Sequence, residues 1–80
     1  MNYDSIEALI KPICSKTSNI SILTSNLVDI ILEYPREAIS ISNLSILKSK
    51  IILQIIVITY INHDKAHEIA CEIIKNVLES

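Results

Sequence analysis

The stretch KIILQIIVITYI, residues 50–61, is the most informative part of this chain. Almost every residue in it is β-branched or aromatic, and that composition favours a long β-strand. Alternate side chains of a strand point to opposite faces, and here both faces are largely apolar. A chain of 80 residues can cover one such face with its own helices, but hardly both. The second face is therefore predicted to contact another protein.

A second strand is predicted over residues 38–47, where apolar residues alternate with small polar ones and one face is solvated. The polar tripeptide KSK at 48–50 then forms the turn of a hairpin. After the hairpin, residues 64–79 predict a helix that Asn62 or Asp64 can cap. Apolar residues recur along it at helical spacing: Ala66, Ile69, Ala70, Ile73, Ile74, Val77 and Leu78.

The first half of the chain leaves alternatives open. Residues 20–34 favour a helix ended by Pro35, although Val28, Ile30 and Leu32 could also share one face of a strand. Residues 4–14 fit a helix or an edge strand, because Pro12 removes a backbone donor that a helix interior needs. The preferred order is β-α-β-β-α. It gives one α+β domain over residues 1–80, a three-stranded antiparallel sheet with two helices on one face.

Composition excludes several function classes. The net charge of −2 disfavours a dedicated nucleic-acid binder. The chain has no glycine, so phosphate-binding loops and dinucleotide turns cannot form. Two distant cysteines and the lack of a basic N-terminal segment predict a reduced, cytoplasmic protein. The apolar run at 51–61 is too short to span a bilayer, so we expect no membrane association.

The last helix carries three side chains of types that can bind metal or react: His63, His67 and Cys71, spaced i, i+4 and i+8. That spacing covers about 12 Å, too far for three ligands of one ion. Cys71 and His67 also lack the orienting group and oxyanion donors of a nucleophilic site. We therefore expect neither catalysis nor a metal, no cofactor and no small-molecule substrate.

The predicted order and several segments resemble the small Pcc-type subunits of the KEOPS complex, which makes threonylcarbamoyl-adenosine in tRNA. The resemblance rests on ISISNLSIL at 39–47, the KSK turn, IILQIIVITY at 51–60 and the helix after NHD at 62–64. It implies a non-catalytic dimerisation subunit that contacts tRNA only indirectly. Many members carry an Arg, Asn and Ser pattern where this chain has AHEIACEII at 66–74. That departure implies a divergent paralogue paired with a related small subunit, or with itself.

The leading functional hypothesis is thus an accessory KEOPS subunit that acts through a dimer interface. The residues expected in the partner interface lie on the long strand and the last helix: Ile52, Ile56, Ile58, Tyr60, Ile69, Ile73 and Val77. The alternative is an all-α interaction or regulatory protein of viral or plasmid type, without enzymatic activity, in which residues 44–61 form a buried helix.

Overall fold

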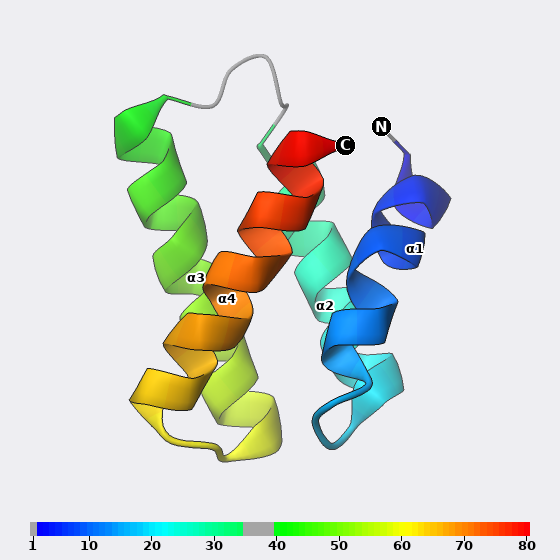
Figure 1. Cartoon of the computed structure of the whole chain (residues 1–80), viewed down its shortest axis with the longest axis vertical. Coiled ribbons are helices and arrows are strands. Elements are labelled where there is room, and N and C mark those ends of the chain that lie inside the picture. Colours follow the sequence, from blue (N-terminus) through cyan, green and yellow to red (C-terminus); the bar gives the residue numbers. More distant parts are fainter. Residues whose placement is uncertain (1, 35–39) are drawn as a thin grey trace.

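The computed structural model describes residues 2–34 and 40–80, and within them the chain forms four helices. Helix α1 spans Tyr3–Cys14, α2 spans Ile20–Leu32, α3 spans Ile41–Thr59 and α4 spans His63–Glu79. Successive helices run in opposite directions, so the two termini lie at the same end of the molecule (Figure 1). Helices α1 and α3 each pack against both α2 and α4. The architecture is an up-and-down four-helix bundle.

The predicted α+β fold is wrong, because the described residues contain no strand. A single helix, α3, stands in place of the expected hairpin. It contains residues 41–47 of the first expected strand, the turn at 48–50 and residues 51–59 of the long strand. Pro35 and residues 38 and 39, which the sequence placed at a helix end and a strand start, lie outside the described residues. The all-α alternative gives the observed fold class.

Helix α3 forms because its apolar residues also satisfy a helical period. Ser40 caps its start, since its Oγ accepts a hydrogen bond from the backbone N–H of Asn43 at 3.2 Å. Leu47, Ile51 and Ile55 then recur at every fourth position, and all three are buried. Burying such a side chain contributes about 1.5–3 kcal/mol. The β-propensity scale spans only about 1 kcal/mol, so tertiary packing outweighs it.

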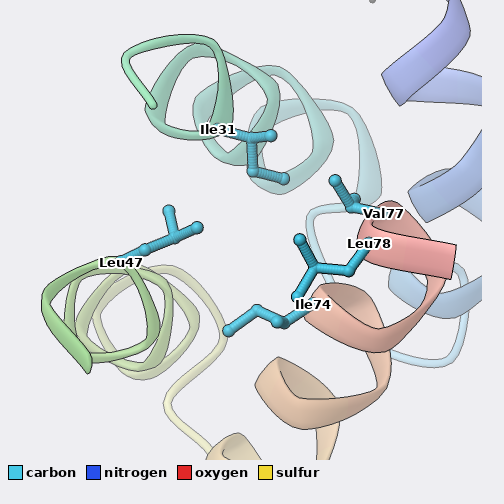
Figure 2. A pocket seen from close by; sticks show the side chains of 5 residues that line it. All are labelled: Ile31, Leu47, Ile74, Val77 and Leu78. Carbon is cyan, nitrogen blue, oxygen red and sulfur yellow. The ribbon is translucent and has the colours of Figure 1, made fainter. Parts of the chain in front are cut away.

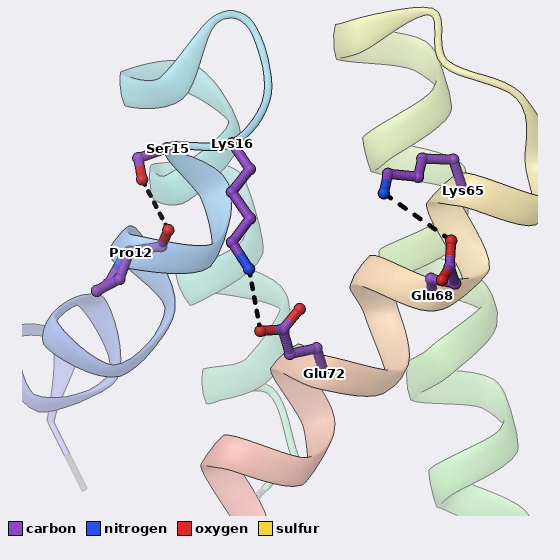
Figure 3. Close-up of polar contacts among 6 residues, drawn as sticks. All are labelled: Pro12, Ser15, Lys16, Lys65, Glu68 and Glu72. Carbon is purple, nitrogen blue, oxygen red and sulfur yellow. Dashed lines mark hydrogen bonds and ion pairs between the residues drawn. The ribbon is translucent and has the colours of Figure 1, made fainter.

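The other helices agree better with the sequence. Helix α4 and its cap are confirmed, because Asn62 Oδ1 accepts a hydrogen bond from the N–H of Lys65 at 2.8 Å. The preference for a helix over residues 20–34 is confirmed by α2. The first segment is helical as well, and Pro12 is accommodated in its last turn on the exposed side. Around it, Ser15 Oγ donates to the Pro12 carbonyl at 2.7 Å (Figure 3).

One continuous apolar core joins the four helices. Each helix contributes side chains with no exposed area, and these form its centre: Ile10, Leu23, Leu27, Ile51, Ile55 and Ile73. The surface ion pairs add little to this core. Lys16 and Glu72 lie 3.3 Å apart between the α1–α2 turn and α4, and Lys65 and Glu68 lie 3.9 Å apart within α4 (Figure 3). All four side chains are largely solvated.

Two buried threonines allow a matched test of this core. Thr24 Oγ1 is buried without a hydrogen bond of good geometry, whereas Thr59 Oγ1 donates to the Ile55 carbonyl at 2.6 Å. Thr24→Val should therefore raise the free energy of unfolding by about 1 kcal/mol, because it removes a buried hydroxyl whose polar neighbour is the weakly hydrogen-bonding Cys14 thiol. Thr59→Val should lower it by about 1 kcal/mol, because a made hydrogen bond is lost. Urea unfolding measures both changes, and a loss of stability in both variants would contradict this description of Thr24.

Candidate interaction surface

Helix α3 is apolar on the side that faces away from the core as well as on the side that faces it. Ile46, Leu53, Val57 and Tyr60 are 50%, 59%, 55% and 87% exposed. They follow one another at intervals of seven, four and three residues, which places them on one side of the helix and its C-cap. We call these four residues the outer face of α3. It extends over about 21 Å of helix length.

Polar contacts flank the outer face on the side of α2. Lys50 Nζ lies 3.5 Å from Glu33 Oε2 and 5.3 Å from the centroid of the Tyr34 ring. The hydroxyl of Tyr34, more than the carboxylate of Glu33, raises the pKa of the Lys50 ammonium. Nearby, Asn26 Nδ2 donates to Gln54 Oε1 at 3.3 Å. These contacts hold the charged and amide groups of this flank toward α2.

Helix α4 carries the histidine and cysteine side chains whose spacing suggested a metal or reactive site. Cys71 Sγ lies 3.7 Å from His67 Nδ1, and the rings of His63 and His67 are stacked with centroids 6.4 Å apart. Both Cys71 and His67 are exposed. Within residues 2–34 and 40–80, no group of three or more His, Cys, Asp or Glu side chains could hold a metal ion.

A small apolar recess opens between α2, α3 and α4 (Figure 2). Its lining is entirely aliphatic: Ile31, Leu47, Ile74, Val77 and Leu78. The empty space is about 200 Å³ when its open mouth is included. It has no polar group that could orient a ligand, so it is a shallow extension of the core surface.

The residues predicted for the partner interface do not share one face. Ile69, Ile73 and Val77 are core residues of α4, and Ile52 is buried on α3. Ile56 and Ile58 are partly buried, while Tyr60 is largely exposed at the end of α3. The sequence predicts four of them on one face of a strand. That face does not exist, because residues 41–59 form a helix. Their role in binding a partner stays a prediction, and of the seven only Tyr60 lies on the outer face.

The sequence reasoning missed Ile46, Leu53 and Val57. A strand places Leu53 and Val57 on the same face as Ile51 and Ile55, whereas a helix separates them. The seven-residue interval from Ile46 to Leu53 to Tyr60 was the signal that could have revealed this face.

Helix α3 is also, among the described residues, the one helix that could cross a membrane by length and composition. The most apolar 18 consecutive residues of α3 have a mean hydropathy of 1.7, and 22% of this segment is buried inside the fold. The run at 51–61 is too short by itself to span a bilayer, but the helix that contains residues 51–59 of it begins ten residues earlier, at Ile41. Length and composition alone are weak evidence of a membrane span.

No family model, curated protein or solved structure matches this chain.

Tyr60 occupies a backbone conformation that disfavours it. It is the C-cap of α3 with φ 59° and ψ 22°, in the left-handed region that glycine or asparagine usually takes at this position. The chain has no glycine, and a bulky residue in this region costs on the order of 1 kcal/mol. Because the side chain is 87% exposed, contacts within the chain offset little of this cost.

Tyr60→Asn should therefore raise the free energy of unfolding, by up to about 1 kcal/mol, because asparagine tolerates the left-handed region. Thermal unfolding followed by circular dichroism measures the change. A clear loss of stability in Tyr60→Asn would show that the ring stabilises the folded chain itself.

The two thiols should differ in reactivity. Cys71 is exposed and Cys14 is fully buried, so a water-soluble disulfide reagent should titrate one thiol in the folded protein and two after unfolding. Rapid modification of both thiols without denaturant would contradict the position of Cys14.

Burial raises the pKa of the Cys14 thiol above its ordinary value of 9.0. The side-chain interaction with Thr24 lowers the pKa and so opposes part of this shift. Above that value the unfolded chain loses the thiol proton and the folded chain keeps it, so the contribution of Cys14 to stability should fall as the pH rises. The free energy of unfolding should decline less steeply between pH 8 and about pH 10 in Cys14→Ala than in the unmodified chain.

Proposed function

We propose that this chain is a small non-enzymatic interaction module that binds another protein through the outer face of α3. The observation that carries the proposal is the exposure of Ile46, Leu53, Val57 and Tyr60 on one side of a helix whose other side already fills the core. The largest apolar patch on a small protein is often a binding site, whereas single exposed apolar residues are common.

The conformation of Tyr60 supports the same proposal. An exposed aromatic residue is kept at a cap where asparagine would fit the backbone better. Residues held in unfavourable backbone regions are concentrated at functional sites. Tyrosine is also enriched where protein interfaces concentrate their binding energy.

Magnitudes indicate what the partner must offer. Completing the burial of three half-exposed aliphatic side chains contributes about 3 kcal/mol, and Tyr60 adds about 2 kcal/mol. Association costs at least about 4 kcal/mol in lost motion. The outer face alone is therefore barely sufficient, and a partner must bury apolar surface of its own against it.

A protein surface fits these requirements better than a lipid bilayer. Lys50 and Gln54 border the outer face within the same helix, and a charge at the bilayer centre costs several kcal/mol. A protein interface tolerates both groups at its polar rim. A role in the KEOPS complex has no support from the fold, since the order of strands and helices behind that resemblance is absent from the described residues.

The test is affinity capture from an extract of the native host with the tagged full chain. Leu53→Glu should abolish recovery of the specific partner, because it places a charge at the centre of the outer face. Ile22→Glu on α2 is the matched control, since Ile22 is exposed to the same 59%. It should leave recovery unchanged. If neither a captured protein nor self-association of the chain distinguishes Leu53→Glu from Ile22→Glu, the proposed function is wrong.

A further inference from the structure

We infer that the outer face of α3 packs against the same face of a second copy of this chain, in an antiparallel arrangement with its two-fold axis beside Leu53. The inference rests on the proposed function and names the partner. A symmetric dimer needs a surface that is complementary to itself, so that a residue on one side of the axis meets its counterpart from the other side. The outer face of α3 has this property.

The positions on the two sides of Leu53 match in spacing. Ile46 lies seven residues before it and Tyr60 seven residues after it, so each would meet the other across the axis. Leu53 would meet Leu53 of the second copy. The three contacts lie about 10 Å apart along the helix, as successive layers of an antiparallel helix pair do.

The positions also match in size. Ser49 lies four residues before Leu53 and Val57 four residues after it, so a small side chain would meet a larger one. Alternating small and large side chains let two helices approach closely and interlock. Ser49 is exposed, as are Leu53 and Val57, so all of these positions are accessible in the single chain.

Charge favours the antiparallel arrangement over the parallel one. No Asp or Glu occurs between residues 41 and 60, and Lys50 is the charged residue beside the outer face. A parallel pair would place Lys50 beside Lys50 of the second copy, without an acid on either α3 to compensate. The antiparallel pair places Lys50 opposite Ile56 instead. Its ammonium stays with Glu33 of its own chain, and its aliphatic stem covers the apolar contact.

The available area sets the strength of the dimer. The four side chains of the outer face offer roughly 400 Å² per copy, from the usual areas of aliphatic and aromatic side chains and their exposure. Stable complexes bury about 800 Å² per partner. Flanking residues such as Ile56 and Lys50 add part of the difference. The dimer is thus a weak, reversible one that forms in the micromolar range and above.

Sedimentation equilibrium of the purified full chain tests the inference between about 1 and 300 µM. The average mass should rise with concentration from 9.0 kDa toward twice that value. Leu53→Glu should remain monomeric throughout, and Ile22→Glu should behave as the unmodified chain does. Tyr60→Asn should weaken self-association at least tenfold although its fold is not destabilised. A chain that stays monomeric, or equal loss in Leu53→Glu and Ile22→Glu, would overturn the inference.

Disulfide trapping tests the orientation. In a Cys71→Ser background, mild oxidation with diamide, which accepts the two thiol hydrogens, should link two copies of Leu53→Cys. Ile46→Cys and Tyr60→Cys should each remain unlinked alone and should link to each other when mixed. Efficient linking of Ile46→Cys to itself would show a parallel pair and overturn the inference.

The outcomes separate this inference from the proposed function. A monomeric chain that still captures a different protein in a manner sensitive to Leu53→Glu overturns the second copy as partner and leaves the interaction module standing. A monomeric chain that captures nothing but co-sediments with phosphatidylcholine–phosphatidylglycerol vesicles, again sensitive to Leu53→Glu, overturns both.

Discussion

The burial of one side of α3 is the constraint on which the rest of the structure depends. Ile51 and Ile55 have no exposed area and lie in the core shared by all four helices. Because α3 contacts both α2 and α4, these side chains fix the order of the helices around the core. In the part of the chain that the structure describes, the ion pairs are solvated and both cysteines are free. Aliphatic packing therefore supplies most of the stability of the bundle.

The same helix connects the fold with the proposed function. An amphipathic helix in a four-helix bundle usually exposes polar groups on its outer side, as α4 does with its lysine and glutamate residues. Helix α3 instead continues its aliphatic composition onto the outer face and ends at Tyr60 in a left-handed cap. Neither feature stabilises the single chain. Both are accounted for if the outer face is covered by apolar surface of a partner, and the symmetry about Leu53 makes a second copy the partner that fits.

The sequence predicted the helices whose polar and apolar residues separate clearly. Helix α4 has a cap at Asn62 and an apolar stripe facing a charged side, so its period is evident. Helix α3 has no such contrast. Where residues 51–58 are apolar at nearly every position, periods of 2 and 3.6 residues fit equally well, and the β-branched composition then favoured the wrong one. The error in period moved Leu53 and Val57 to the wrong side, so the expected interface omitted them and included Ile52, which is buried. The sequence also predicted more apolar surface than the chain can cover by itself. That prediction holds for a period of 2 or of 3.6 residues, because residues 51–58 are apolar at nearly every position.

The most direct test of this account is the thiol accessibility of single cysteine variants along α3 in a Cys71→Ser background, for variants that still unfold cooperatively. Cysteines at Leu53 and Val57 should react rapidly in the folded protein, and cysteines at Ile51 and Ile55 should be protected as Cys14 is. A strand would place all four positions on one face and give them a common reactivity. Equal reactivity at the four positions would contradict a helix with one buried and one exposed apolar side.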